Sequence, residues 1–301
     1  MSRVVLLLAR AHVLAMGACL LLAGTARAGA QDQDAIDGLR ARYAALQGAL
    51  AQNVFGRPLY LESEQNGAEA RVNIHAVLAH PFARLNAGLD APDHWCDILI
   101  LHLNIKQCRS SGGAEDAKLT VHIGSKHWQA VEAAQKIVFD FHVRADTAEY
   151  LRVELHADSG PMGVRDFRIE LEAIPLAAGQ SFMHLSYAYT SGLTARLAMQ
   201  GYLATVGSGK VGFTVVGHGL DGKPVYIGDV RGVIERNTMR YYLAIDIYMD
   251  TFDGPPTADQ LDVRLHRWFA ATEAYARQLH EIDEAEYLDM KRREIARQQG
   301  S

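Results

Sequence analysis

An alternation of apolar and polar residues with a period of two runs through the middle of the chain, and it constrains the fold more than any other feature. Such alternation is typical of β-strands that bury one face and expose the other. A turn at 158–163, which contains Gly and Pro, joins two of these segments as a hairpin. We therefore predict a first strand followed by a meander of about six antiparallel strands. The alternating segments are 72–78, 99–105, 119–123, 137–143, 150–157, 167–171 and 183–189.

Apolar residues at spacings of three and four predict helices around and within this run of strands. A short helix begins at Pro81, and a longer one with a wide apolar face spans 193–206. Strand, short helix, antiparallel meander and long helix is the element order of an α+β helix-grip fold. In that fold a curved sheet wraps around the closing helix, here 193–206. The other expected helices are 33–53, 233–248, 261–282 and 283–297, and a hairpin is expected at 211–227.

The first 28 residues have the features of a secretory signal peptide. Arg3 and Arg10 precede an apolar run of 12 residues, 13–24, and the small-x-small cleavage pattern Ala26-Arg27-Ala28 follows. A membrane-spanning helix needs about 20 apolar residues, so the run is too short for a permanent anchor. We therefore expect an exported, periplasmic protein with no stable transmembrane anchor after cleavage.

The net charge of the mature chain argues against two classes of partner. Cleavage after Ala28 would remove three Arg and no acidic residue, so 27 basic residues would remain against 35 acidic ones, and the formal charge would move from −5 to −8. No run of Lys or Arg is dense enough to follow a phosphate backbone. Nucleic acid is therefore not an expected partner, and neither is an anionic lipid surface bound by charge alone.

Two cysteines, Cys96 and Cys108, remain after cleavage. An even number of cysteines in an oxidising compartment favours a disulfide between them. Two buried thiols are the alternative, because the segment between the cysteines reads as a strand that would hold the sulfur atoms apart.

Two stretches combine these patterns with particular residues. In the first, 72–95, a strand leads into a helix that starts at Pro81 and continues with Phe82. In the second, 151–167, two strands flank the turn Gly160-Pro161-x-Gly163. Together they resemble the opening and the central hairpin of START-like proteins, a superfamily also called SRPBCC or birch-allergen-like.

This resemblance implies a cavity between the sheet and the closing helix, which in the superfamily often holds a lipid, a sterol or another apolar molecule. Some members are cyclases or hydratases. Residues 208–297 extend beyond the compact form of the superfamily. Three short phrases, Trp95-Cys96-Asp97, 210–214 and 235–242, are also similar to uncharacterised secreted proteins of proteobacteria, a family that implies no activity.

These patterns divide the chain into five segments. The START-like domain is the central one, and the segments around it are a signal peptide, two helical extensions and a tail. We expect the signal peptide at 1–28, the N-terminal amphipathic helix at 29–56, the START-like domain at 57–207, the hairpin and helical C-terminal extension at 208–297, and the tail at 298–301.

No motif for catalysis, metal binding or cofactor binding occurs in the context that its chemistry needs. The segment 207–212 matches GxGxxG, but it links a helix to a strand, the reverse of the order that directs a helix N-terminus at a dinucleotide phosphate. Neither GxSxG nor HExxH occurs. The His, Cys and Asp residues within 94–102 cross a helix-to-strand junction, without a spacing that gives metal ligands a shared geometry. We therefore assign no catalytic residue, metal ligand or cofactor.

The best prediction is a noncatalytic binding or carrier protein for a hydrophobic or amphipathic small molecule such as a lipid. Arg236 and Arg240 lie four residues apart on one helical face and would meet the polar end of the ligand. The residues expected to contact its apolar body are Phe139, Phe141, Phe167, Tyr187, Tyr189, Met199, Tyr202 and Leu203.

Two alternatives from other classes stay open. One is an enzyme of START-like architecture, a cyclase or a hydrolase, with His184 or Asp97 as a base. The sequence shows no partner for either residue. The other is an envelope protein-interaction module without a ligand, which would expose an apolar patch around Trp268 and Tyr275.

Overall fold

The computed structural model describes residues 30–113, 115–192, 201, 205, 207, 209–252 and 257–299. The expected signal peptide lies outside these residues, and so does most of the helix expected at 193–206, with Met199, Tyr202 and Leu203. The chain divides into two compact units, Met1–Ala45 and Leu46–Ser301. The described part of the first unit belongs to a helix that spans 30–51, close to the predicted 33–53.

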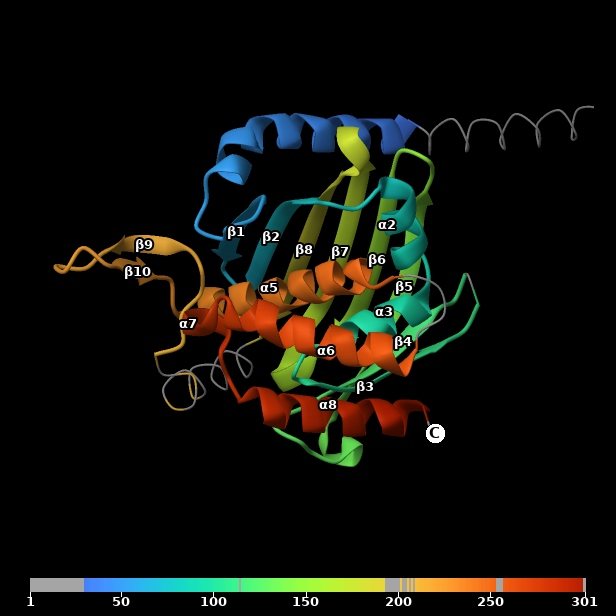
Figure 1. The fold of residues 1–301 in the computed structure, drawn as a ribbon, viewed down its shortest axis with the longest axis vertical. Helices are drawn as coiled ribbons and strands as arrows, with labels where there is room; N and C mark the ends of the chain where they lie inside the picture. The colour runs from blue at the N-terminus through green and yellow to red at the C-terminus, as the bar shows by residue number, and fades with distance from the viewer. Residues whose placement is uncertain are drawn as a thin grey trace, which may run out of the picture. The chain divides into compact units, whose positions relative to one another are not determined.

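The second unit is built on a curved, eight-stranded antiparallel sheet (Figure 1) with the spatial order β1-β2-β8-β7-β6-β5-β4-β3. Strands β3 to β8 form a six-stranded meander, and β8 then pairs with β2. The predicted fold class and the meander are confirmed. The strands are β1 (Leu59–Asn66), β2 (Glu69–Leu78), β3 (Ile105–Ser111), β4 (Lys118–Ile123), β5 (Gln135–Asp146), β6 (Leu151–Ser159), β7 (Val164–Pro175) and β8 (Ser181–Ser191).

Burial in the central strands follows the alternation in the sequence. In β6, Leu151, Val153 and Leu155 are at most 1% exposed, whereas Arg152 and Glu154 between them are partly exposed. A slip of one residue would turn these charged side chains toward the core. The register of the sheet is therefore specified by the sequence pattern itself.

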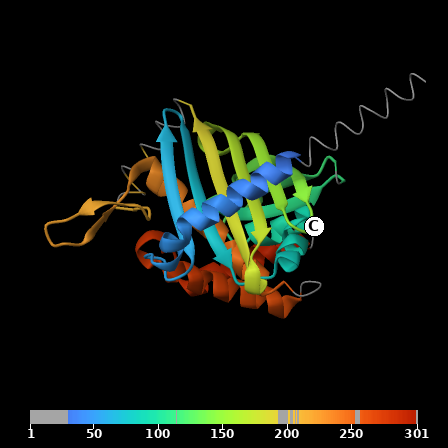
Figure 2. The same ribbon diagram turned by 90° about the horizontal axis from the view of Figure 1, so that it is seen from above.

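The helix that the sheet wraps around is α5 (Asp229–Asp250), which contacts β1, β2 and β8 on one side and α3 and α6 on the other. Every residue from Thr238 to Ile245 is buried, as expected for a helix packed between two layers. Figure 2, seen from above, shows the strands on one side and the C-terminal helices on the other. From the sequence we predict 193–206 as the closing helix and assign the residues of α5 to the C-terminal extension. In the described chain, the helix packed against the sheet is α5.

The remaining helices surround this core. Within the described ranges, no helix combines the length and the hydrophobicity that crossing a membrane requires. The hairpin predicted at 211–227 is present as β9 (Val215–His218) and β10 (Pro224–Tyr226). The helices are α2 (Phe82–Leu89), α3 (Pro92–Leu99), α6 (Ala258–Glu273), α7 (Ala276–Leu279) and α8 (Glu284–Gln299), with the short 3-10 helices η1 (Val131–Ala133), η2 (Pro161–Gly163) and η3 (Ala177–Gly179).

The predicted helix at 261–282 is interrupted. It begins earlier, with α6, whose capping box joins Thr257 and Gln260. α6 ends at Glu273, and Tyr275 has the non-helical dihedral angles φ −120° and ψ 40°. The Tyr275 hydroxyl donates to the carbonyl of Phe55 at 2.8 Å. The helix is thus interrupted at the residue that makes this tertiary contact, and the apolar spacing of 261–282 does not indicate the interruption.

The prediction of a strand at 99–105 is wrong. α3 ends at Leu99, a turn follows, and β3 begins only at Ile105. Leu99, Leu101 and Leu103 are all at most 3% exposed, because the turn itself is buried. A buried turn of this kind produces the same alternating pattern as a strand.

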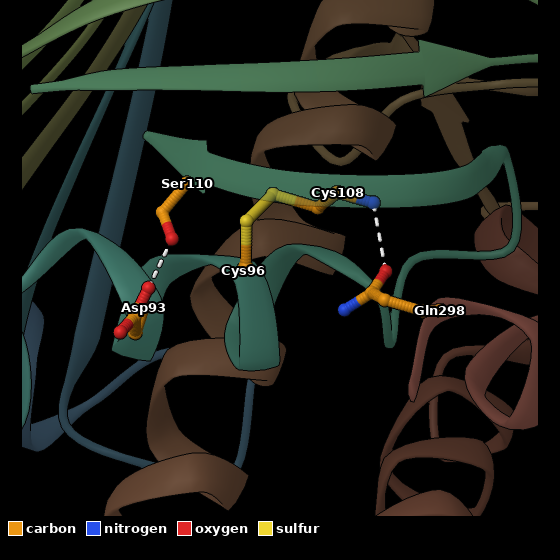
Figure 3. Close-up of a disulfide and its surroundings, with 5 residues drawn as sticks. All are labelled: Asp93, Cys96, Cys108, Ser110 and Gln298. Carbon is orange, nitrogen blue, oxygen red and sulfur yellow. Dashed lines mark hydrogen bonds between the residues drawn. A yellow bond between two sulfur atoms is a disulfide. The ribbon is translucent and has the colours of Figure 1, made fainter. Parts of the chain in front are cut away.

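The turn brings Cys96 on α3 and Cys108 on β3 together in a disulfide, with their Cα atoms 5.1 Å apart (Figure 3). The segment between the cysteines is not one strand, so the sulfur atoms are not held apart. Asp93 and Ser110 form a hydrogen bond between the same two elements.

β3 is an edge strand of the sheet, and side chains of α8 bond to its backbone. Gln298 accepts a hydrogen bond from the N–H of Cys108 at 2.8 Å (Figure 3), and Arg297 donates to the carbonyl of Lys106 at 2.7 Å. Edge strands present backbone groups that can pair with another chain. At Lys106 and Cys108, side chains of α8 supply the hydrogen bonds that these backbone groups of the edge strand need.

Candidate ligand cavity

A cavity of about 330 Å³ is lined by α5, by strands β4, β5, β7 and β8, and by the segments that join the outer elements. Its lining combines aromatic and aliphatic side chains with a group of charged and polar ones. The apolar lining residues in the described chain are Ile123, Pro161, Val164, Phe167, Tyr187, Tyr189, Val230, Val233 and Tyr241, and the polar or small ones are His102, Asn104, Gly124, Lys126, Gln135, Ser191, Arg236, Asn237, Arg240 and Glu281.

Five of the predicted ligand residues line this cavity. Three are aromatic residues of β7 and β8, and two are arginines of α5. Phe139 and Phe141 do not line it: Phe139 packs behind Phe167 at 5.3 Å between ring centroids, and Phe141 packs against Trp95 at 6.4 Å. Met199, Tyr202 and Leu203 lie outside the described residues. The five lining residues are Phe167, Tyr187, Tyr189, Arg236 and Arg240.

The pairing of β7 with β8 is irregular next to Phe167, one of the aromatic lining residues. The register between β7 and β8 shifts between Arg165 and Arg168, and Asp166 within the shift has φ 52°, a conformation that Asp tolerates better than most residues. A bulge re-aims the neighbouring side chain. Phe167 meets the ring of Tyr187 edge-on, with 5.1 Å between centroids and 83° between planes.

The tyrosines give the aromatic surface several hydroxyl groups. Burial raises the pKa of Tyr187 and of Tyr241 far above the ordinary value and that of Tyr189 to about 12, so all three hydroxyls stay protonated. Within the described ranges these hydroxyls have no hydrogen-bond partner. They are therefore donors that a ligand can use.

Glu281, in the segment between α7 and α8, is the acidic residue among the described lining residues. One of its carboxylate oxygens accepts from Arg240 at 3.0 Å, and the other contacts the ammonium groups of Lys126 at 2.6 Å and Lys210 at 2.9 Å. Burial alone would raise the pKa of this carboxyl, but Arg240, Lys126 and Lys210 together lower it to about 2. Glu281 is therefore ionised at physiological pH.

Arg236 and Arg240 on α5 are both about 2% exposed. Arg240 also donates to the carbonyl of Leu279 at 3.1 Å, and Arg236 donates to the carbonyl of Val211 at 3.2 Å. These bonds to backbone carbonyls help to fix the two guanidinium groups. The predicted pair of arginines therefore lies in the cavity lining, where Arg240 is also paired with Glu281.

His102 lines the cavity as a neutral hydrogen-bond donor. Its Nδ1 accepts from the backbone N–H of Asn104 at 3.1 Å, which assigns the ring proton to Nε2. Nε2 is buried and has no partner in the described chain. Burial, and then the charges of Arg240 and the neighbouring lysines, hold the pKa of this imidazole well below 6.5. Sequence reasoning considered His102 only as a metal ligand, and no local motif indicates this role.

The residues considered as catalytic bases lie elsewhere. His184 points away from Tyr187 and Tyr189 on β8, and its ring nitrogens contact Glu172 at 3.1 Å and Asn73 at 3.0 Å. Asp97 forms an ion pair of 3.6 Å with Arg264. It lines a second hollow, of about 560 Å³, between α3, α6 and α8.

The apolar patch expected for an interaction module is not present at Trp268, which is 1% exposed and stacks on Tyr287 at 5.1 Å. Tyr275 is partly buried against Phe55. Among the described residues, no group of three or more His, Cys, Asp or Glu side chains is arranged to hold a metal ion.

No protein-family model and no curated protein sequence matches this chain. Solved structures with some similarity include a truncated norcoclaurine synthase from Thalictrum flavum, with 11% identity, coverage of 48% of this chain and 91% of that one, and a TM-score of 0.34. Ara h 8.0201 is 12% identical over 64% of this chain and 99% of its own, with a TM-score of 0.35. CalU16 from Micromonospora echinospora is 11% identical over 74% and 98%, with a TM-score of 0.31. Likenesses at this level assign neither a family nor an activity.

Proposed function

We propose that this protein is a periplasmic binding or carrier protein for a small amphipathic molecule, which it holds in the cavity beside α5 without changing it chemically. The observation that carries the proposal is the composition of one cavity, in which an aromatic surface from β7 and β8 and a group of charged side chains share the same lining. Binding sites for small molecules are mostly apolar with a few placed polar groups. The signal-like N-terminus and the Cys96–Cys108 disulfide support export.

The volume of the cavity limits the size of the ligand. A volume of about 330 Å³ is at the small end of the range for small-molecule sites, roughly 300–1,000 Å³. One short acyl chain or a small ring system fills such a space. A lipid with two long chains would leave most of its apolar surface outside, so we favour a single-chain or ring-containing amphiphile.

The lining suggests how such a ligand is oriented. Its apolar body lies against Phe167, Tyr187 and Tyr189, where burial excludes water from apolar surface on both sides. Its polar end lies toward the charged part of the lining, which includes Arg236 and Arg240.

The proposal is noncatalytic because neither His102 nor Glu281, among the described lining residues, is available as a base. His102 has its Nδ1 lone pair engaged with Asn104 and its proton on Nε2, so it is a donor and not a proton acceptor. Glu281 is held by three cations, which lower its pKa to about 2 and make it a weak base.

Filling the cavity tests the proposal. Val233 lines the cavity from α5, and Val233→Trp places an indole where the ligand body would lie. We expect calorimetric titration with 1-octanol to show binding to the wild-type protein and at least a tenfold weaker affinity for this variant. Val263→Trp is the matched control, because Val263 is 41% exposed on α6 and away from the cavity. Equal affinities for all three proteins would contradict the proposed site.

A further inference from the structure

We infer that the β9–β10 hairpin, residues 215–226, docks onto the surface of a phospholipid bilayer; this inference goes beyond the proposed function and can fail without it. Both views of the fold show the hairpin projecting away from the sheet and the helices of the second unit (Figure 1 and Figure 2). Of the eight large apolar side chains that are exposed in the described chain, four lie on this hairpin: Val215, Val216, Leu220 and Val225. Leu220, in the turn between the strands, is fully exposed.

The described chain covers neither face of the hairpin. Neighbouring residues of a strand point to opposite faces, and the neighbours Pro224 and Val225 on β10 are both exposed. Val215 and Val216 on β9 are exposed as well. A two-stranded hairpin is only marginally stable by itself in water, and exposed apolar surface marks sites that contact a protein or a membrane. The hairpin therefore presents apolar side chains to a partner outside the described chain.

The composition of the hairpin favours a bilayer over a protein as this partner. Trp, Tyr and Arg dominate the binding energy of protein interfaces, whereas Leu and Val are under-represented there. The exposed large apolar residues of the hairpin are Val and Leu alone. A protein surface covers one face of a hairpin, whereas the interface of a bilayer surrounds an inserted tip. Apolar residues on both faces and at the tip therefore fit a lipid surface.

Docking of the hairpin depends on apolar contact and not on charge. Asp221 and Lys223 are its charged residues, and they form an ion pair of 3.0 Å. With His counted as neutral, the hairpin therefore has no net formal charge. The mature chain has an expected charge of −8, which gives no attraction to an anionic surface. We therefore assign the docking to zwitterionic lipid.

The tip of the hairpin suits shallow insertion. Its backbone is paired within the turn, where the N–H of Gly219 donates to the carbonyl of Lys223 and the N–H of Gly222 donates to the carbonyl of Gly219, both at 2.9 Å. Asp221 directly follows Leu220, and charged groups are costly in the hydrocarbon core. Leu220 therefore enters the interfacial region, while the ion pair stays at the level of the head groups.

The base of the hairpin is fixed to α5. Glu235 is fully buried, and its carboxylate accepts from the backbone N–H groups of Phe213 and Thr214 at 2.5 and 3.0 Å. The N–H of Ile227 donates to the carbonyl of Thr214 at 2.8 Å. α5 begins three residues after β10 ends, and its residue Val230 lines the cavity. Docking of the hairpin therefore holds this part of the cavity lining close to the bilayer, where amphiphiles dissolve.

Sedimentation with vesicles of phosphatidylcholine tests the inference on the full-length mature protein. We expect Leu220→Asp, which places a charge at the tip, to lower the partition coefficient onto these vesicles at least fivefold. Val54→Asp is the matched control, because Val54 is 76% exposed and lies outside the hairpin, and it should change the coefficient less than twofold. Vesicles that also contain phosphatidylglycerol should bind the wild-type protein no more tightly.

A fluorescent variant measures insertion of the tip directly. Leu220→Trp keeps an apolar side chain in the turn and should bind the vesicles at least as tightly as the wild type. On binding, the emission of the added Trp should shift to shorter wavelength and be quenched by brominated phosphatidylcholine. The wild-type protein, with its three Trp residues, supplies the background. Val54→Trp should show neither change.

Three results would overturn the inference: no binding of the wild type to phosphatidylcholine vesicles, binding only when phosphatidylglycerol is present, or equal binding of Leu220→Asp and the wild type. A wild-type dimer, seen by analytical ultracentrifugation without vesicles and dissociated by Leu220→Asp, would also overturn it, because the hairpin would then bind a second copy. Leu220 does not line the cavity, so Leu220→Asp should keep the wild-type affinity for 1-octanol. Failure of vesicle binding alone would leave the proposed ligand cavity standing.

Discussion

Lys106, Lys291 and Glu294 are each fully buried where α8 meets β3. Glu294 lies 3.1 Å from the ammonium of Lys106 and 2.8 Å from that of Lys291. Lys291 also donates to the carbonyls of His102 and Ile105 at 2.8 and 2.7 Å, yet burial lowers its pKa to about 8. Two buried cations thus depend on one carboxylate.

Replacement of that carboxylate should be strongly destabilising. Glu294→Gln leaves both lysines without an anionic partner, and breaking a buried ion pair from one side costs about 3–5 kcal/mol. Urea unfolding measures the loss. Glu286→Gln, which removes a 47% exposed carboxylate paired with His127, should change stability by less than about 1 kcal/mol. A similarly small effect of Glu294→Gln would show that the buried cluster does not stabilise α8.

Glu281 makes stability depend on acidic pH. Its folded-state pKa of about 2 lies below the 4.5 of an unperturbed Glu, so the unfolded chain takes up the proton first as pH falls. The stabilisation by this carboxylate is complete above about pH 4.5 and is lost as pH falls toward 2. The difference in unfolding free energy between wild type and Glu281→Gln should be constant from pH 7 to pH 5.5 and shrink below pH 4.5. A difference that stays constant down to pH 3 would contradict this.

The sequence predicts some residues of the cavity and not others. The alternation in β8 puts Tyr187 and Tyr189 on the same face of the strand. The spacing of four residues puts Arg236 and Arg240 on the same face of a helix. Both inferences need only local geometry. Glu281 lies 41 residues after Arg240 in the chain, and no periodicity relates the two. Glu281 is therefore recognised as part of the polar end of the cavity only in the folded chain.

At the scale of elements, the disulfide joins α3 to β3 across a sequence separation of 12 residues. Closing a loop of this size in the unfolded chain is worth about 3 kcal/mol. We expect the free energy of unfolding of the double variant Cys96→Ser, Cys108→Ser, measured by urea denaturation, to be lower than that of the wild type by that amount. Reductant should destabilise the wild-type protein similarly and leave the double variant unchanged. Equal stability of oxidised wild type and double variant would show that the bridge does not stabilise the fold.

The prediction of strands succeeds where one face of the strand is buried and the other is exposed. It fails where a segment is buried on all sides, because apolar residues then no longer report which element they belong to. β6 alternates cleanly because its polar residues stay partly exposed. The turn after α3 is buried, so its apolar spacing resembles that of a strand and predicts the wrong element for Leu101 and Leu103. β1 escapes detection because most of its residues are only partly buried or exposed, which weakens the alternation.

At the scale of the whole molecule, the cavity depends on elements that lie far apart in the sequence of the second unit. The sheet supplies Phe167, Tyr187 and Tyr189, α5 supplies Arg236 and Arg240, and the segment before α8 supplies Glu281. The sequence predicts the α+β helix-grip class, since strand and helix periods are local properties. It does not predict that α5 packs against the sheet, because 193–206 and 233–248 are both apolar enough for that position.

Native mass spectrometry of the mature protein, purified from the cell envelope without detergent, tests the central claim most directly. We predict a bound small molecule in the native spectrum that is released by denaturation and is missing from Val233→Trp but present in Val263→Trp. Titration with 1-octanol should then produce a one-to-one adduct in the wild type. A wild-type spectrum that shows only the unbound chain, before and after this addition, would contradict a ligand cavity beside α5.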